Sequence, residues 1–409
     1  MKRFVSSVMA WLMRNRGRLP RWFVRIVDDV AVNPDGLAGR VSARLLGGAG
    51  AVPATRVRPG WPRVYIGPTN YAGQGFRWAR ALEREAPGLV AANMAIELPG
   101  GFAFPADSVV PVAVQTASKR WQIAEFDAVS SFSHVLFEAQ RSLFGPLYRR
   151  NVLDEIDALR AAGVSCALLA HGTDVRDPSA HLAREPFSPY GDDPRREIVQ
   201  AEVDRSRAII AAAGVPVFVS TPDLLLDVPS ASWCPVVVNL DAWATPFLPL
   251  QRAVPVVVHV PSMGSVKGSQ LIEPALRALH DAGVIEYRAL SNIPAASMPE
   301  VIANADVVLD QFLIGSYGVG AVEAMAAGRL VVGHVDARVR SLVEQATGLP
   351  LPMVEADPAT ITKVISNIAA NPKRFATLAA TGVQFATDVH SGRRSARVLL
   401  DGWILLDAR

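Results

Sequence analysis

Two loops in the second half of the chain place a charged side chain beside the start of a helix. Lys267 and Gly268 follow the apolar run 254–260 and open an amphipathic pattern. The chain has 36 arginines and only five lysines, so a lysine here is not routine. A helix start offers unpaired N–H groups and a positive dipole end, which favour an anion. Lys267 suits a phosphate site, and a solvated lysine with Gly268 as a turn residue explains the pattern equally well.

The second loop follows the apolar run 306–312, and its small residues lead into an Ala-rich helix. Glu323 lies in the first turn of that helix or just beyond it. A carboxylate there stabilises the helix dipole by about 0.3–1 kcal/mol. A carboxylate can also accept hydrogen bonds from the two neighbouring hydroxyls of a ribose, as an acidic residue does in dinucleotide sites.

The first half of the chain has two similar loops. Gly73, Gln74 and Gly75 lie between an apolar run and a helical pattern, where glycines let the backbone approach a ligand closely. The full G-x-G-x-x-G pattern of dehydrogenases is missing. His171 and Asp174 follow the apolar run 164–170, and we expect a functional role there, with a capped turn as the alternative. His134 lies among apolar residues, so we expect it to be structural.

Apolar runs alternate with helical patterns through most of the chain, which predicts parallel sheets covered by helices on both faces. The fold class is therefore α/β, with two Rossmann-like domains. We place an extension and linker at 1–60, the domains at 61–245 and 253–385, and a closing segment at 386–409. Expected strands cover 63–68, 126–133, 164–172, 215–221, 254–260, 284–290, 306–312 and 329–335; expected helices cover 73–85, 152–163, 195–214, 267–283, 297–305 and 320–328.

The composition of the 409 residues excludes several classes of protein. A net charge of +3 is too small to indicate nucleic-acid binding. The two cysteines form no disulfide framework, and no H-E-x-x-H, Asp-x-Asp or Cys/His cluster predicts a metal site. Residues 1–27 carry seven basic side chains and no acid before Asp28. This segment fits either a membrane interface or packing on protein, and it resembles neither a signal peptide nor a membrane span.

Together these motifs resemble the retaining GT-B glycosyltransferases of family four (glycosyl transferases group 1). The resemblance covers most of residues 62–409. It is carried by "VPSMGSVKGS", "ANADVVLDQF", "STPDLL" and "GSYGVGAVEAMAAGRLVV". The loop motif DQxxxGxYG resembles that of a bacterial branch of the family. It implies two Rossmann-like domains facing across a cleft, with the closing helix crossing back to the first.

The resemblance also implies roles for particular residues. Lys267 would bind the donor diphosphate, Glu323 the ribose, and His171 would face the reacting sugar or the acceptor, with Asp174 on the acceptor side. Two positions depart from the family pattern: Gly315 stands where the family has a Glu, and Ser262 where it has a phosphate-binding Arg. The other donor-binding residues implied are Gly73, Gln74, Gly75, Gly268, Ile293, Ser316, Tyr317, Gly318 and Val319.

The resulting hypothesis is a glycosyltransferase that moves a sugar from a nucleotide-sugar, such as a UDP- or GDP-sugar, to a glycan or lipid-linked acceptor. It would retain anomeric configuration and need no metal or other cofactor. We expect a cytoplasmic protein, held at the inner face of the membrane if residues 1–27 bind lipid. The alternatives are a catalytically inactive GT-B subunit that binds nucleotide-sugar or scaffolds a partner, and a sugar-nucleotide epimerase.

Overall fold

A computed structural model of the chain describes residues 52–98, 104–261, 267–291 and 293–406. The chain divides into two compact units: the first comprises residues 1–174, 204–218 and 400–409, and the second comprises 175–203 and 219–399. Residues 1–51, Ser262 and Asn292 lie outside the described residues, so the expectations for the basic segment and for Ser262 remain predictions. Among the helices that the structure describes, none is long and apolar enough to span a membrane.

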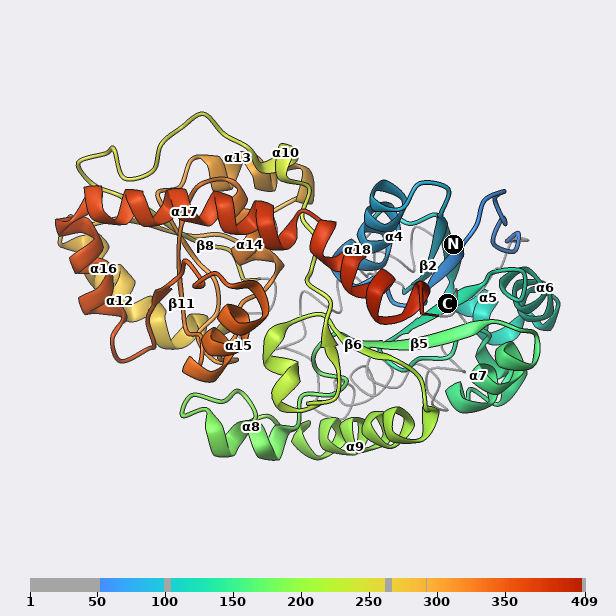
Figure 1. Cartoon of the computed structure of the whole chain (residues 1–409). Helices are drawn as coiled ribbons and strands as arrows, with labels where there is room; N and C mark the ends of the chain where they lie inside the picture. Colours follow the sequence, from blue (N-terminus) through green and yellow to red (C-terminus); the bar gives the residue numbers. More distant parts are fainter. Residues whose placement is uncertain (1–51, 99–103, 262–266, 292, 407–409) are drawn as a thin grey trace, which may run out of the picture. The chain divides into compact units, whose positions relative to one another are not determined.

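The first unit is built on a sheet in the order β3-β2-β1-β4-β5-β6-β7, and the pairs from β3 to β5 are parallel. The central strands β1, β4 and β5 are buried along most of their length, because helices pack beside them (Figure 1). The strands are β1 (Arg63–Gly67), β2 (Val90–Glu97), β3 (Ser108–Pro111), β4 (His134–Glu138), β5 (Ser165–Ala170) and β6 (Val217–Val219), whose last residue belongs to the second unit.

The helices around this sheet bury apolar faces against one core that contains Tyr65, Phe137, Leu159 and Leu168. Thr55 packs here too, since its backbone N–H and hydroxyl both donate to the Glu125 carboxylate at 2.7 Å. The helices are η2 (Tyr71–Gly73), α4 (Gln74–Glu85), α5 (Val112–Ala117), α6 (Lys119–Val129), η3 (Gly145–Tyr148), α7 (Val152–Ala161), α9 (Arg196–Ala213), which begins in the second unit, and the π-helical turn η6 (Leu400–Ile404).

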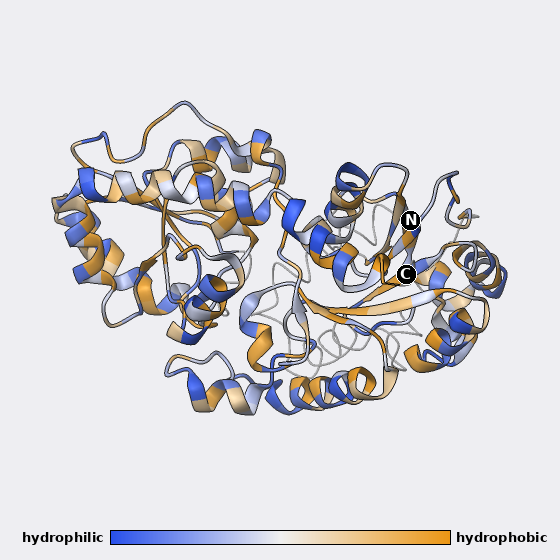
Figure 2. Cartoon of the chain, viewed as in Figure 1, coloured by the Kyte–Doolittle hydropathy of each residue, from blue (hydrophilic) through white to orange (hydrophobic). Residues whose placement is uncertain are grey.

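The second unit has its own sheet in the order β12-β11-β10-β8-β9, and its strand pairs are parallel. Its central strands are apolar except at His259, as expected of strands that are covered on both faces (Figure 2). The strands are β8 (Val256–His259), β9 (Glu286–Ala289), β10 (Val307–Leu309), β11 (Leu330–Gly333) and β12 (Val354–Glu355). The short β7 (Ser232–Trp233) is the last strand of the other sheet.

Helices of the second unit pack in pairs, α12 with α16 and α14 with α17. The apolar faces of α12, α16 and α17 join β8, β10 and β11 in a second core. The helices are α8 (Pro178–Arg184), η4 (Pro222–Leu226), α10 (Leu240–Trp243), α12 (Ser269–Asp281), η5 (Ala295–Ser297), α13 (Met298–Ala303), α14 (Val319–Ala326), α15 (Ala337–Thr347), α16 (Ile361–Ala370), α17 (Pro372–His390) and α18 (Arg393–Leu399).

One predicted strand is wrong. Residues 126–133 were expected to be extended, yet α6 runs through Val129 and β4 begins only at His134. The Ser118 hydroxyl caps α6 by accepting a hydrogen bond from the Trp121 N–H at 3.3 Å, and the buried residues of α6 recur at helical spacing. Strands β2 and β3 were not anticipated.

The segment after β5 joins the second unit, although it is enclosed in the sequence by parts of the first. Two buried ion pairs link this segment to η4 and the residue that follows it: Arg176, just before α8, with Asp223 at 2.6 Å, and Arg184, the last residue of α8, with Asp227 at 2.7 Å. The boundaries proposed from sequence, 61–245 and 253–385, stay predictions. The chain from Leu400 returns to the first unit after α18.

Candidate functional site

In the second unit, Lys267 lies at the carboxyl edge of the parallel sheet. Its ammonium is 3.3 Å from a carboxylate oxygen of Asp310, which is buried and follows β10. The Phe312 N–H donates to the Lys267 carbonyl at 3.2 Å, so the two loops are joined by backbone as well. Gly268 caps α12 with φ +77°, a left-handed conformation that favours glycine.

The same carboxylate reaches the start of α14. The second oxygen of Asp310 accepts a hydrogen bond from the Gly318 N–H at 3.1 Å. A Cβ at Gly320 would lie 3.9 Å from both Asp310 Oδ1 and Lys267 Nζ, and a Cβ at Gly318 would meet open space. The structure therefore brings Lys267, Gly318 and Val319 together at a helix start, where an anion is favoured. Sequence reasoning missed the role of Asp310, although a carboxylate that ends a buried strand was a usable signal.

His259 links the elements around Lys267, and sequence reasoning missed this residue too. It ends β8, donating or accepting at both ring nitrogens: Nδ1 lies 3.1 Å from the Leu309 carbonyl and Nε2 lies 2.8 Å from the Ser269 hydroxyl. Burial lowers the pKa of His259 to about 4. A neutral imidazole therefore ties β8, β10 and α12 together next to Lys267.

The other residues predicted for donor binding occupy this edge in different ways. The Tyr317 ring is buried, with its hydroxyl 3.2 Å from His390 Nε2, so Tyr317 can offer a ligand only its backbone. The Ser316 carbonyl accepts from the Gln311 amide at 2.7 Å. Glu323 is the fifth residue of α14, just beyond the first turn, and is half-buried. Ile293 lies in the loop that follows β9 and is half-buried.

Gly315 has a geometric reason to be glycine. Its φ is +67°, and a Cβ there would collide with the carboxylate of Glu185, whose Cδ would lie 2.7 Å away. Glu185 follows α8 and forms an ion pair with His334 Nε2 at 2.9 Å, and His334 Nδ1 lies 2.6 Å from Glu355. Hydrogen bonds to these two carboxylates raise the pKa of His334 to about 10. The carboxylate of Glu185 therefore lies beside Gly315.

In the first unit, His171 pairs with Glu138, a residue that sequence reasoning missed. Glu138 ends β4 and is completely buried, and His171 follows the neighbouring strand β5. One Glu138 oxygen lies 3.0 Å from His171 Nε2, and the other accepts from the N–H groups of Thr69 and Asn70 at 3.1 and 2.9 Å. The carboxylate therefore fixes both the imidazole and the glycine loop.

The pairing of Glu138 with His171 shapes the loop that contains Gly73 and Gly75. A Cβ at Gly75 would lie 2.5 Å from the Asn93 amide nitrogen and 3.2 Å from Glu138, so only glycine fits. Asn70, Ala72 and Gly73 all have positive φ, and Gly73 caps α4. Gln74 is buried. Strained backbone of this kind is typical of ligand-binding loops.

Asp174 has a local role. Its carboxylate accepts hydrogen bonds from the backbone N–H groups of His171 and Gly172, the shortest at 2.6 Å. It therefore builds the turn that holds His171, as the capped-turn alternative expected. His134 is buried in β4 with its ring edge-on to Trp403 at 5.0 Å, as expected of a structural residue.

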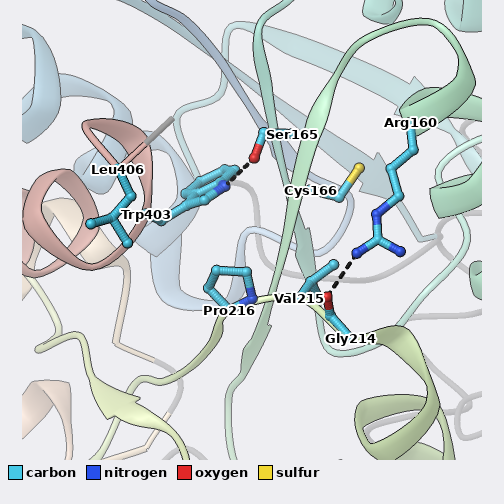
Figure 3. A pocket seen from close by; sticks show the side chains of 8 residues that line it. All are labelled: Arg160, Ser165, Cys166, Gly214, Val215, Pro216, Trp403 and Leu406. Atoms are coloured by element: carbon cyan, nitrogen blue, oxygen red, sulfur yellow. Dashed lines mark hydrogen bonds between the residues drawn. The ribbon is translucent and has the colours of Figure 1, made fainter. Parts of the chain in front are cut away.

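A pocket of about 230 Å³ lies at the opposite end of β5 from His171 (Figure 3). Its polar groups bond to one another: Trp403 Nε1 donates to the Ser165 hydroxyl at 2.9 Å, and Arg160 donates to the Gly214 carbonyl at 2.7 Å (Figure 3). Burial raises the pKa of Cys166 to about 12, so its thiol is unreactive. This pocket lies where the closing segment, through Trp403 and Leu406, packs on the rest of the first unit.

Within the described residues, no group of three His, Cys, Asp or Glu side chains is arranged to hold a metal ion. No protein-family model matches the chain. No curated protein matches it either.

Solved structures do match. Sucrose-phosphate synthase from Thermosynechococcus elongatus is 15% identical, with 82% of this chain and 96% of that chain covered and a TM-score of 0.52. HepE of Anabaena, in complex with UDP and glucose, is 11% identical, with 83% and 98% covered and a TM-score of 0.53. A glycosyltransferase from Rickettsia africae is 11% identical, with 83% and 96% covered and a TM-score of 0.52. The chain therefore has the GT-B fold: two parallel-sheet α/β domains and a helical C-terminal segment.

Proposed function

We propose that this protein is a glycosyltransferase that takes a sugar from a nucleotide-sugar and attaches it, with retention of configuration, to a glycan or lipid-linked acceptor. The observation that carries the proposal is the corner of the second unit where Lys267, Asp310, Gly318 and Gly320 meet. An ammonium beside the start of a helix, with glycines that leave room for a ligand, suits a diphosphate. The GT-B fold and the UDP bound to HepE support this reading.

Lys267 and the start of α14 would act mainly by stabilising negative charge on the leaving diphosphate. When the bond between the sugar C1 and the diphosphate oxygen breaks, negative charge develops on that oxygen. Lys267 and the N–H groups at the start of α14 would face this position; Asp310 holds the ammonium, and the hydrogen bond from the Gly318 N–H to Asp310 holds the loop. Preorganised donors of this kind are usually the largest contribution to catalysis. Glu323 would hold the ribose hydroxyls from α14.

His171 would contact the reacting sugar or the acceptor, with Glu138 as a positioning residue. The imidazole is held by Glu138 on Nε2 and flanked by Tyr71 and Trp78, whose ring centroids lie 5.1 and 5.6 Å away. An imidazole held on three sides keeps one orientation, as a group that meets a reacting sugar must. His171→Ala is expected to lower turnover more than donor affinity.

The test begins with a thermal-shift panel of UDP, GDP, ADP and their sugars, because binding to the folded state raises the melting temperature. With the best donor, we expect Glu323→Gln to weaken binding about tenfold or more in calorimetry, since a charge-assisted hydrogen bond contributes about 1.5–3 kcal/mol. Glu344→Gln, on the exposed face of α15, is the control and should bind normally. Equal donor affinity in all three proteins would exclude Glu323 from the site. A chain that binds donor but transfers no sugar would be the inactive subunit.

We also expect transfer to persist in excess EDTA, because Lys267 supplies positive charge at the diphosphate. Transfer rates would be compared with and without chelator, and then after addition of Mg²⁺ or Mn²⁺. Activity that disappears with EDTA and returns with a divalent ion would contradict the role proposed for Lys267. The anomeric configuration of the product, measured by NMR, tests retention in the same reaction.

A further inference from the structure

The pocket at the amino end of β5 is open to solvent and takes no part in the proposed transfer. Its volume is about 230 Å³, and the eight residues that line it all belong to the first unit. His171 follows the other end of β5, so the pocket and the proposed reaction lie at opposite edges of the sheet. Leu406, on one side of the pocket, is 54% exposed, and Arg160, on the other side, is exposed too (Figure 3). A small molecule can therefore enter the pocket from solvent.

One side of the pocket is apolar. Trp403, Leu406, Val215 and Pro216 lie there (Figure 3). Trp403 is 2% exposed, and its Nε1 donates to the Ser165 hydroxyl at 2.9 Å, so the indole keeps one orientation. Leu406 leaves more than half of its surface to water, and an apolar group that covers it gains hydrophobic free energy. This side suits a ring or a short alkyl chain.

The other side of the pocket carries a positive charge. Of the eight residues that the structure places around the pocket, Arg160 alone is charged. Its Nη2 donates to the Gly214 carbonyl at 2.7 Å, which holds the guanidinium in place. A guanidinium has five N–H donors, so this bond leaves donors for a ligand. A fixed arginine of this kind binds a carboxylate or a phosphate through charge-assisted hydrogen bonds.

We propose that this pocket binds a small organic anion, with its apolar body against Trp403 and Leu406 and its carboxylate or phosphate on Arg160. The volume is below the about 300–1,000 Å³ that is typical of sites for drug-sized ligands, so the body is no larger than a single ring. An uncharged molecule of the same shape makes no ion pair with Arg160 and binds more weakly. The inference does not rest on the proposed function, because it uses none of the residues assigned to sugar transfer.

Binding of the ligand also joins two distant parts of the chain. Trp403 and Leu406 belong to the closing segment, and Val215 and Pro216 lie between α9 and β6. A molecule that contacts both holds the closing segment on the rest of the first unit. Hydrogen exchange at residues 400–406 should therefore slow when the pocket is occupied.

The first test locates the site and its preference for charge. Phenylacetate and phenyl phosphate are the anionic probes, and phenethyl alcohol and phenethylamine are the neutral and cationic controls. Each is titrated into the full chain with isotope-labelled tryptophan, which gives one indole N–H signal for each of the eight tryptophans. Loss of a signal in Trp403→Phe identifies the signal of Trp403.

We expect at least one anion to shift the Trp403 signal, with an affinity about fivefold above that of phenethyl alcohol, as one partly exposed ion pair allows. Phenethylamine should bind more weakly than the alcohol. The two anions, compared with each other, show whether the pocket prefers a carboxylate or a phosphate. An unchanged Trp403 signal with both anions, or equal affinity for anion, alcohol and amine, would overturn the proposal.

The second test removes the charge. Arg160→Met keeps the length of the side chain and should lower the affinity for the anion to that for the alcohol, whereas Arg160→Lys should keep part of the preference. Arg120→Met, at an exposed arginine of α6 outside the pocket, is the control and should bind as the unchanged chain does. If Arg160→Met does not fold, Arg160→Gln takes its place. A preference for anions that persists without the charge would contradict the role of Arg160.

The third test uses two neighbouring leucines. Leu406→Ser should weaken binding of the anion and the alcohol alike, by severalfold, because it removes apolar surface from the pocket. Leu405→Ser is the matched control, since Leu405 is 42% exposed but does not line the pocket. Equal affinities in both variants would place the probes elsewhere and overturn the proposal.

This proposal and the proposed function fail separately. Nucleotide-sugar affinity, measured by calorimetry, should be unchanged in the Arg160 and Leu406 variants, because the pocket belongs to the first unit and Lys267 to the second. A chain that binds no nucleotide-sugar but shows an Arg160-dependent shift of Trp403 would contradict the glycosyltransferase and keep the anion pocket. Normal donor binding with an unchanged Trp403 signal would do the reverse.

Discussion

Gly315 and Gly320 lie five residues apart, yet a side chain at each would meet different surroundings. At Gly315 a Cβ would collide with Glu185, and the backbone φ is +67°. At Gly320, in the first turn of α14, a Cβ would fit at 3.9 Å from Lys267 and Asp310. One glycine is therefore required by the fold, and the other keeps space beside the proposed diphosphate site.

We expect Gly320→Ala to separate stability from binding. Alanine stabilises a helix relative to glycine by up to about 1 kcal/mol, so the variant should unfold at slightly higher denaturant concentration. The added methyl group takes the space next to the Lys267 ammonium, so donor affinity should fall severalfold in calorimetry. Unchanged affinity would show that no ligand approaches this face of α14.

Gly315→Ala should have the opposite effect on stability. The left-handed backbone and the contact with Glu185 both oppose a Cβ, so we expect a loss of about 1–3 kcal/mol in the free energy of unfolding. Denaturant titration would measure it. Glu185→Ala loses the ion pair with His334 in either background, but it should destabilise this variant less than the unchanged chain, because the steric conflict disappears. Equal losses in the two backgrounds would mean that backbone strain alone accounts for the effect of Gly315→Ala.

At the scale of elements, one buried carboxylate holds the loop between β1 and α4 in place. Glu138 accepts hydrogen bonds from Thr69, Asn70 and His171, which belong to two different loops. The loop contains non-glycine residues in the left-handed backbone conformation, which is strained, and another loop conformation would remove that strain. The conformation of this loop therefore depends on Glu138, at the end of β4, more than on the sequence of the loop itself.

Glu138→Gln is expected to loosen that loop without unfolding the sheet. Glutamine keeps one acceptor and points an amide N–H₂ at either the backbone N–H groups or His171, so a charge-assisted hydrogen bond worth about 1.5–3 kcal/mol is lost. Hydrogen exchange at residues 69–75 should accelerate, while exchange in β4 and β5 stays slow. Glu85→Gln, at the exposed end of α4, is the control. Equal exchange in all three proteins would show that Glu138 does not organise the loop.

At the scale of the whole molecule, the pH dependence of stability should come from histidines of the second unit. Burial lowers the pKa values of His181, His259 and His390 to about 4, below the unfolded value near 6.5. The folded state then binds fewer protons than the unfolded state between pH 4 and 6.5. Stability from these three is present above pH 6.5 and is lost as the pH falls through about 4.

His334 has the opposite sign. Hydrogen bonds to Glu185 and Glu355 raise its pKa to about 10, so the stability it contributes is present below pH 6.5 and is lost as the pH rises through 10. We expect the second unit to be most stable near pH 6.5 and to weaken on both sides. Urea titrations across pH 4–10 would measure this. His334→Gln should flatten the alkaline limb only, and a change confined to the acid limb would contradict the assignment.

The sequence by itself determined the class of fold and the positions of the glycine loops. Runs such as "VSCALLA" and "VPVVVHV" are apolar at nearly every position, as a strand buried on both faces needs, and helical spacing marks the segments between them. These signals are local, because strand and helix periodicities repeat within a few residues. The parallel sheets and the loops at Lys267, His171 and Gly73–Gly75 were predictable for that reason. The strand expected at 126–133 failed where a helix cap and a short apolar run competed.

The tertiary structure alone decided which of those residues work together. Glu138 and His171 are 33 residues apart, Lys267 and Asp310 are 43 apart, and Glu185 reaches His334 across 149 residues. The first two pairs meet because strands of a parallel sheet end at one edge, and the order of strands in the sheet sets which ends are neighbours. The third pair meets because Glu185, at the end of α8, belongs to the second unit. That order, and the attachment of α8 to the second unit, depend on packing between distant segments. No local pattern in the sequence records such packing.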